Sequence, residues 1–413
     1  MKILVLTPYA YPEKVASSHL GQNRNQAFKE NGFEMVVYAP TPCRGISKEE
    51  RKKYKRKEWR NEKRLGGAMS IHRFSLFKEG KNPFFRALRY IICCIKHFDR
   101  AVFSRDARNC DVMFIASTPP IQGAMAALVK KIRNIPFVYN LQDIFPDSLI
   151  GAGITQRGTL LWKIGRMIEN FTYRNADKII VISEDFKKNI MAKGVPEEKI
   201  EVIYNWIDEN AVIPIAREAN HLYEELGLSR DKFNVVYAGN LGNAQNIDVI
   251  IDSAKELVEN KNIEFVIFGS GGLKEQFVKK VKDYGIDNVK FFPLQPMEKV
   301  SYVYGLGNIC IVSCKPGLGG SAMPSKTMSI LSAGRPVLAS FDEGELTSIL
   351  QQNYCGVSVR AGDVEAFVEE VKRLASNSKE CDVMGKNGRE LILRKFTREV
   401  GTRKYVDIIK SII

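Results

Sequence analysis

Short apolar runs recur along the first half of the chain, and helical sequence separates them. They occupy residues 2–6, 34–38, 111–116, 136–140 and 178–182. Brief apolar runs bounded by turn residues are typical of strands that are buried on both faces. Their alternation with helices predicts a parallel sheet with helices on both sides.

The same pattern starts again after a polar stretch at about residues 207–231. Five further runs follow, at residues 233–239, 263–269, 289–292, 309–312 and 336–339. Ligand sites of such sheets lie at the carboxyl ends of the strands, and in a two-domain enzyme they face the cleft. The chain therefore predicts the α/β class, with two doubly wound, Rossmann-like domains facing a cleft.

Two segments interrupt the alternation in the first half. Residues 48–64 are densely basic, and residues 83–104 read as a helix on which large apolar side chains, among them Phe84, Leu88 and Ile95, share one face with arginines around it. A basic amphipathic helix can lie among lipid headgroups, and each basic residue adds about 1 kcal/mol near anionic lipid. These segments predict a peripheral membrane contact. The alternative is an ordinary helix over the sheet and a solvated basic loop.

Charge supports an anionic partner for the first half. The 413 residues carry a net charge of +15, and residues 1–200 alone hold 36 basic and 19 acidic side chains. Such an excess fits a membrane surface, a phosphorylated acceptor or nucleic acid. No nucleic-acid-binding motif is visible, so nucleic acid is not expected as a partner.

Composition indicates an ordinary globular protein, with 45% hydrophobic and 26% charged residues. The eight cysteines form no C-x-x-C pair, which favours free thiols in a reducing compartment. No run reaches the roughly 18 apolar residues that span a bilayer. A cytoplasmic protein at the inner face of the cell membrane is the prediction.

Two glycine-bearing turns follow strands of the second half, at residues 239–242 and 269–272. Glycine lets the backbone approach a ligand, and the N–H groups of a following helix can receive a phosphate. Many such turns only reverse the chain. Neither matches G-x-G-x-x-G, and no P-loop motif occurs, which disfavours oxidoreductases and P-loop kinases.

The more specific feature is the loop, helix and strand predicted within residues 319–340, which contain Met323, Pro324, Ser325 and Lys326. Pro324 suits a helix start, and Ser325 or Ser321 could cap free N–H groups. Lys326 would add a charge beside the positive helix end, so a diphosphate is the natural ligand. The alternative is a capped helix whose lysine points to solvent.

This segment resembles the donor-site signature of the family-4 retaining glycosyltransferases, in particular the L-fucosamine-transferase-like branch with Pro-Ser-Lys in bacterial surface-polysaccharide assembly. Residues 203–208, 237–245 and 268–271 and the Gly388-Arg389 pair resemble that branch as well. The resemblance implies a GT-B fold. It also implies an acceptor-binding, membrane-facing domain of residues 1–207 plus about 397–413, and a donor-binding domain of residues 208–396.

The resemblance further implies which residues bind a nucleotide-sugar donor: Gly239, Asn240, Gln245, Gly269, Gly271, the backbone around Leu294, Ser325, Lys326 and Thr327. The glutamates usual in the family are missing, because Ser321 and Ser329 occupy their places. Many family members have arginine and lysine near the positions of Asn240 and Gln245, so the resemblance implies that Lys326 carries much of the leaving-group neutralisation here. Departure of a nucleoside diphosphate requires stabilised negative charge. No D-x-D occurs, so neither a metal nor a cofactor is expected.

Candidates in the first domain are Asp143, Ser117 and His19. Asp143 matches the family's Asp-x-x-Pro element and could orient the acceptor hydroxyl or the sugar, or it could simply cap a helix. Ser117 follows a neighbouring strand. His19 would lie in the loop after the first strand near the acceptor, although a lone histidine is more often structural.

The predicted function is transfer of a hexosyl or N-acetylhexosaminyl group from a nucleotide sugar to a lipid-linked or glycan acceptor, with retention of configuration implied by the resemblance. A non-catalytic basic membrane-binding module with a vestigial nucleotide site is the first alternative. A nucleotide-sugar epimerase of the same fold is the second, but it would need carboxylates at the donor loop to abstract a proton.

Overall fold

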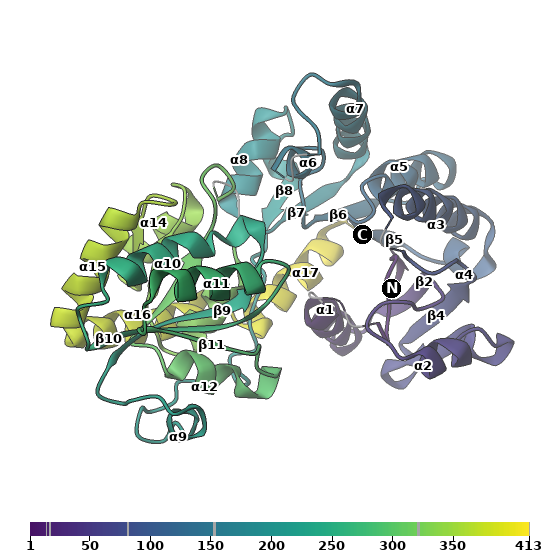
Figure 1. The fold of residues 1–413 in the computed structure, drawn as a ribbon. Helices are drawn as coiled ribbons and strands as arrows, with labels where there is room; N and C mark the ends of the chain where they lie inside the picture. Colours follow the sequence, from purple (N-terminus) through teal and green to yellow (C-terminus); the bar gives the residue numbers. More distant parts are fainter. Residues whose placement is uncertain (14, 16–17, 81, 152–153, 320–322, 413) are drawn as a thin grey trace. The chain divides into compact units, whose positions relative to one another are not determined.

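The computed structural model describes the whole chain except residues 14, 16–17, 81, 152–153, 320–322 and 413 (Figure 1). The chain forms two compact units: unit 1 comprises Met1–Tyr204 with Gly401–Ile413, and unit 2 comprises Asn205–Val400. The chain therefore passes between the units twice, after Tyr204 and after Val400. The predicted passages were at residues 207 and about 397.

Unit 1 contains an eight-stranded sheet in the order β3-β4-β2-β1-β5-β6-β7-β8. All neighbouring strands are parallel except β3 and β4. The strands are β1 (Lys2–Leu6), β2 (Glu34–Pro40), β3 (Asn61–Arg64), β4 (Met69–Phe74), β5 (Val112–Ala116), β6 (Phe137–Leu141), β7 (Lys178–Val181) and β8 (Ile200–Val202).

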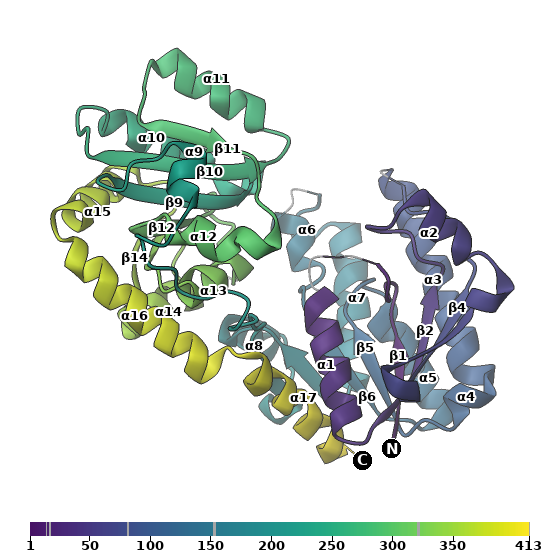
Figure 2. The ribbon, with the colours of Figure 1, turned by 90° about the horizontal axis from the view of Figure 1, so that it is seen from below.

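Helices cover both faces of this sheet. They are α1 (Ser18–Glu30), α2 (Lys48–Lys53), α3 (Pro83–Phe103), α4 (Arg105–Arg108), α5 (Gln122–Arg133), α6 (Asp147–Gly151), α7 (Leu160–Asn175), α8 (Glu184–Ala192) and α17 (Arg398–Ile412). One hydrophobic core joins the sheet to α3, α5, α7 and α8. Helices α1 and α17 lie on the opposite face, where the ring of Phe114 contacts the rings of Phe28 and Tyr405 (Figure 2).

The basic segment 48–64 is more ordered than a solvated loop, and that interpretation was wrong. It forms α2, a short 3-10 helix (Lys57–Trp59) and the edge strand β3, which pairs with β4. Tyr54 is buried, and the Arg73 guanidinium lies 4.7 Å from its ring centre. An edge strand with a polar sequence shows no apolar run, so the pattern of hydrophobic positions did not reveal it.

Unit 2 contains a six-stranded, all-parallel sheet in the order β11-β10-β9-β12-β13-β14. Its strands are β9 (Phe233–Asn240), β10 (Ile263–Ser270), β11 (Val289–Phe292), β12 (Ile309–Ser313), β13 (Val337–Ser340) and β14 (Gly356–Val359). The first five coincide with the five predicted runs to within one residue at each end, and those predictions are confirmed.

The helices of unit 2 are α9 (Leu222–Leu226), α10 (Ile247–Glu256), α11 (Lys274–Tyr284), α12 (Val300–Gly305), α13 (Ser325–Ser332), α14 (Glu345–Gln352), α15 (Val364–Ser376) and α16 (Ser378–Lys395). Helices α10, α11, α15 and α16 share a core with the sheet. The strand order reverses at β9. Strands β10 and β11 follow on one side of β9, and β12, β13 and β14 follow on the other side. The carboxyl end of β9 is therefore where a ligand site is expected in this unit.

The Gly388-Arg389 pair of α16 connects this helix to α13 and to the segment at the start of unit 2. One Arg389 nitrogen donates to Ser332 Oγ at 2.8 Å and to the Val212 carbonyl at 3.1 Å, and the other donates to the Glu209 carbonyl at 2.9 Å. A Cβ on Gly388 would lie 2.7 Å from Leu331, so glycine is required for α16 to approach α13. This part of the family-like sequence has a structural role.

Candidate functional site

The best candidate site in unit 2 lies at the carboxyl end of β9. Gly239, near the end of the strand, has a φ of 154°. A Cβ at this position would lie 2.8 Å from Lys326 Nζ, so a side chain would displace the lysine amine. Glycine here keeps the strand end open to the α13 lysine, which the sequence predicted to act at the same site.

Lys326 lies in the first turn of α13, the helix that follows β12. Its Nζ lies 4.0 Å from the centre of the Tyr237 ring, and the Tyr237 hydroxyl donates to the Asn240 carbonyl at 2.8 Å. The Lys326 amine is buried, and the described residues offer it no hydrogen-bond partner. A cation resting on an aromatic face keeps part of its stabilisation without a counterion, and it remains available to an anion.

Burial lowers the pKa of Lys326 from 10.5 to about 8. The cause is lost hydration, which disfavours the charged amine. An anion bound beside it would restore the ordinary preference for the charged form. The site thus holds a positive charge that is poorly compensated until an anion arrives.

The start of α13 differs from the predicted cap. Pro324 is the N-cap residue and Ser325 is the first helical residue, and no side chain caps this end in the described structure. Ser325 cannot cap because a capping side chain must come from the residue before the helix. Ser321, the other predicted cap and donor contact, lies outside the described residues.

The neighbouring donor-loop residues differ in their access to solvent. Ser325 is exposed, whereas Thr327 is fully buried with its Oγ1 unpartnered among the described residues. Ser329 lies one turn after Ser325 on the same face of α13 and is half-buried. These positions place Ser325, Lys326 and Ser329 along one short helix, while Thr327 faces the interior.

The glycines of the second turn are explained by packing within the chain. A Cβ on Gly269 would lie 2.6 Å from Leu241 Cγ, and a Cβ on Gly271 would lie 2.4 Å from the Leu241 carbonyl oxygen. Their glycine identity is therefore required by the close approach of the β9 and β10 loops. Contact with a nucleotide remains a prediction for both.

Asn240 and Gln245 lie together. The Asn240 amide donates to Gln245 Oε1 at 3.1 Å, which joins the end of β9 to the short helix Asn243–Gln245. Asn240 is exposed, so its other polar atoms can meet a ligand. Leu294, predicted to lie near the base, follows β11 in a loop and is 54% exposed.

In unit 1, Asp143 follows β6 and lies beside the end of β5. The Ser117 hydroxyl accepts the Gln142 N–H at 3.0 Å, so the structure brings the two predicted strand ends together. Asp143 as a residue is exposed, but surrounding protein removes enough water from the carboxyl group to raise its pKa. A hydrogen bond from Ser148 opposes that shift.

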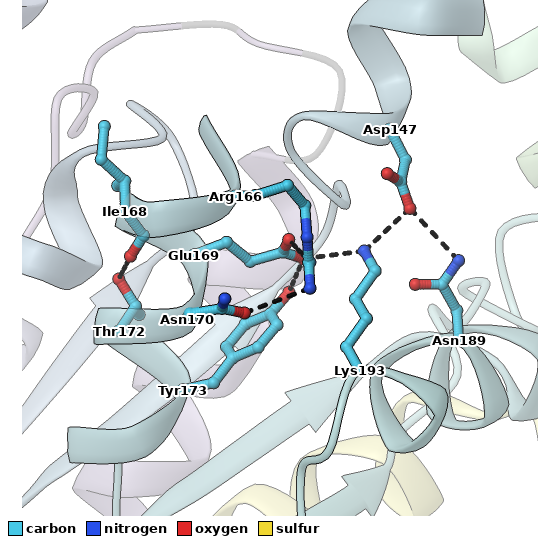
Figure 3. A network of polar contacts seen from close by, with 9 residues as sticks. All are labelled: Asp147, Arg166, Ile168, Glu169, Asn170, Thr172, Tyr173, Asn189 and Lys193. Atoms are coloured by element: carbon cyan, nitrogen blue, oxygen red, sulfur yellow. Dashed lines mark hydrogen bonds and ion pairs between the residues drawn. The ribbon is translucent and has the colours of Figure 1, made fainter. Parts of the chain in front are cut away.

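A buried ionic network anchors the loop that carries Asp143 (Figure 3). Glu169 of α7 is 5% exposed, forms an ion pair with Arg166 and accepts a hydrogen bond from the Tyr173 hydroxyl at 2.7 Å. Lys193, directly after α8, joins Glu169 at 3.0 Å to Asp147 at 2.8 Å. Since Asp147 begins α6 four residues after Asp143, this network fixes the far end of that loop.

His19 lies in the first turn of α1, not in the loop after β1, so that predicted position was wrong. The helix begins at Ser18, one residue earlier. His19 is exposed, and in the described part of the chain no hydrogen bond joins it to Asp143. Its part in the site remains a prediction.

Sequence reasoning missed Tyr237, which supports Lys326, and the Glu169–Lys193 network behind Asp143. The position of Tyr237 was predictable from the sequence, because residues two positions apart in a strand lie on the same face and Tyr237 comes two positions before Gly239. Lys193 and Glu169 are 24 residues apart on separate segments, so no local pattern connects them.

Two family models match the chain. The model described as Glycosyltransferase Family 4 matches residues 25–211, and the model described as Glycosyl transferases group 1 matches residues 220–391. The first covers most of unit 1 and the second covers most of unit 2. Between them they leave few of the elements described above unmatched.

Similar proteins agree with these matches. The probable glycosyltransferase WbjE of Pseudomonas aeruginosa is 23% identical over 74% of this chain and 76% of its own. The putative colanic acid biosynthesis glycosyl transferase WcaI of Escherichia coli is 25% identical over 69% of this chain and 70% of its own. The structure of Anabaena Alr3699/HepE in complex with UDP has a TM-score of 0.72 and 15% identity, with full coverage of both chains.

Proposed function

We propose that the chain is a GT-B glycosyltransferase whose two parts match the Glycosyltransferase Family 4 and Glycosyl transferases group 1 models, and that its unit 2 binds a nucleotide-diphosphate sugar with Lys326 as the clamp of the leaving group. The observation that carries this proposal is the buried Lys326 amine, which has no hydrogen-bond partner in the described structure and lies at the glycine end of β9. A diphosphate supplies the negative charge that this amine lacks.

The donor would extend from Lys326 along the end of the sheet. Asn240, Gln245 and Ser325 are the polar side chains nearest the proposed diphosphate by position in the family-like sequence, and Ser321 and Ser329 would replace the missing glutamates. The UDP complex of HepE supports a nucleotide at this fold. The base, the sugar and retention of configuration are parts of this proposal that rest on resemblance.

Unit 1 would bind the acceptor, with Asp143 orienting the acceptor hydroxyl or the transferred sugar. A carboxylate can accept the hydroxyl proton as the hydroxyl attacks, while Lys326 stabilises the charge that develops on the departing diphosphate. The name of WcaI, which refers to colanic acid biosynthesis, supports a role in assembling a bacterial polysaccharide. The L-fucosamine-transferase-like branch is a part of this proposal that rests on resemblance. The acceptor would be lipid-linked or a glycan, met at the inner face of the membrane.

Donor binding and donor hydrolysis test the proposal together. UDP, GDP and dTDP are titrated calorimetrically against the protein and against Lys326→Met, and hydrolysis of the matching sugars is assayed. We expect the variant to bind its preferred nucleotide at least about tenfold more weakly, because a charged hydrogen bond to a phosphate contributes about 1.5–3 kcal/mol.

The matched control is Lys279→Met, which removes an exposed lysine from α11 in the same unit. It should bind nucleotide as the unmodified protein does. Unchanged affinity in Lys326→Met, together with no turnover of any donor, would contradict the enzyme and favour a vestigial nucleotide site.

A further inference from the structure

Exposed apolar side chains gather on three helices of unit 1. Half of the large apolar residues that are exposed in the described part of the chain lie on α3, α5 and α7. The exposed fractions reach 72% for Phe84 on α3, 60% for Ile132 on α5 and 74% for Leu160 on α7. Single exposed apolar residues need no explanation, but such a concentration marks an interaction surface.

The three helices form one continuous face, with α5 packed between α3 and α7 (Figure 1). Arg133 of α5 donates to the Ala101 carbonyl of α3 at 2.8 Å, and Lys131 of α5 lies 5.0 Å from the ring centre of Phe171 on α7. The opposite sides of these helices are part of the unit 1 core. Packing therefore fixes the apolar face outward, and the face extends well beyond the single helix that its sequence pattern indicated.

The net positive charge of these helices favours an anionic partner. Together α3, α5 and α7 contain ten lysines and arginines and only two acidic residues, Asp99 and Glu169. Arg89 is buried and Arg166 is paired with the buried Glu169, so eight basic residues and Asp99 remain for the surface of these helices. A second copy of this chain would bring an equally basic face against it, which like-charge repulsion opposes. A bilayer with anionic headgroups is complementary to both the apolar and the basic groups.

The basic segment 48–64 carries positive charge but lacks exposed large apolar side chains. None of the exposed large apolar side chains lies within it. Its two aromatic residues face inward or are covered, since Tyr54 is buried and Lys53 Nζ lies 3.6 Å from the Trp59 ring centre. Charge without apolar anchors gives only a salt-sensitive attraction to a membrane.

We propose that α3, α5 and α7 form one lipid-binding face that lies on a bilayer containing anionic phospholipid, and that residues 48–64 do not anchor the protein. The proposal deepens the membrane-side function above and rests on it. Helices α5 and α7 thus take part, although the sequence indicated a membrane contact through residues 48–64 and 83–104.

Vesicle co-sedimentation of the full chain tests the face. Vesicles of phosphatidylcholine alone are compared with vesicles that also contain phosphatidylglycerol. One variant carries Leu128→Gln and Ile132→Gln on α5, and another carries Leu160→Gln and Ile164→Gln on α7. Glutamine changes no charge, so each pair reports apolar insertion. We expect each pair to weaken binding to the anionic vesicles by about tenfold or more.

The matched control carries Val278→Gln and Val383→Gln, two exposed apolar residues of unit 2, and should bind like the unmodified protein. A second comparison, Lys52→Gln with Lys55→Gln, should lower binding far less than either helix pair. If the α5 and α7 double variants sediment with anionic vesicles as fully as the unmodified protein does, the proposal is wrong. A dimer in solution that both pairs dissociate would also overturn it.

Donor hydrolysis distinguishes this inference from the proposed function. All variants should hydrolyse the donor at the unmodified rate, because none lies at the Lys326 site. Intact hydrolysis with unaffected vesicle binding would refute the lipid face alone. Absence of hydrolysis in the unmodified protein would refute the transferase alone.

Discussion

The buried amine of Lys326 lowers the stability of the empty protein at neutral pH. In the folded state the lysine loses its proton near pH 8, whereas an unfolded lysine does so near 10.5. Below pH 8 both states are protonated, and the full cost of burying the charge is present. Between about pH 8 and 10.5 the unfolded state binds more protons, so this cost falls as the pH rises.

We predict that Lys326→Met unfolds with a free energy roughly 2 kcal/mol higher than the unmodified protein at pH 7. Methionine fills a similar volume without a charge. Denaturant unfolding at several pH values measures the effect, and the difference should shrink between pH 8 and 10. A difference that stays constant across that range would show that the Lys326 charge is not its source.

Protonation of Asp143 is expected to cause the fall in the rate of transfer at low pH, the acid limb of the pH profile. The raised pKa of Asp143 means that the carboxylate is lost, and the rate falls, at a higher pH than for an ordinary aspartate. The pH dependence of kcat measures this limb. Asp143→Asn should abolish the limb and lower kcat by about 100-fold, while nucleotide affinity is retained.

Ser148→Ala is a control for Asp143 because the direction of its effect on the pKa of the carboxyl group is predicted. The Ser148 hydrogen bond lowers the pKa of the carboxyl group, so its removal should move the acid limb to higher pH. A limb that stays in place in Ser148→Ala, or persists in Asp143→Asn, would assign the titration to another group.

At the scale of secondary structure elements, the Glu169 network holds α6, α7 and the end of α8 together (Figure 3). Removal of Glu169 leaves Arg166 and Lys193 without a shared buried counterion. Glu169→Ala should lower the free energy of unfolding by about 3 kcal/mol, because an uncompensated buried charge is costly. Thermal unfolding measures it. Glu197→Ala, which breaks the exposed pair with Lys187, should leave the transition unchanged.

Most of the strands readable from sequence bury both faces, although the edge strand β11, in which only Val289 is buried, was predicted as well. Strands such as β5 and β10 consist almost entirely of buried apolar residues, so their sequences stand out. Strands β3, β8 and β14 lie at sheet edges, and β4 lies next to an edge; their mixed sequences escaped notice. The Lys326–Gly239 contact was predictable in outline, since both lie at the carboxyl edge of one sheet. The stacking on Tyr237 required the packed side chains.

At the scale of the whole molecule, unit 1 is completed by the last residues of the chain. Four large residues of α17, Tyr405, Val406, Ile408 and Ile409, are buried. The Tyr405 hydroxyl also donates to Asn140 Oδ1 at 3.1 Å on the face opposite α3 and α5. Each buried side chain contributes about 1.5–3 kcal/mol, and their sum is comparable with the 5–15 kcal/mol that stabilises a typical domain.

Truncation after Val400 should therefore unfold unit 1 and spare unit 2. Limited proteolysis is expected to degrade residues 1–204 and leave a resistant fragment of unit 2 that still binds nucleotide. Removal of residues 411–413 alone should preserve both units. Protease resistance of unit 1 in the longer truncation would contradict the role assigned to α17.

The return of α17 to unit 1 also orders the events of synthesis. While the chain emerges from the ribosome, unit 2 is continuous and can fold as soon as its own residues are free. Unit 1 begins earlier but waits, with the Tyr405 side of Phe114 uncovered, until α17 has been translated. The first unit to begin is thus completed after the second, and a ribosome that stalls before α17 would leave a protein with a formed donor unit and an incomplete acceptor unit.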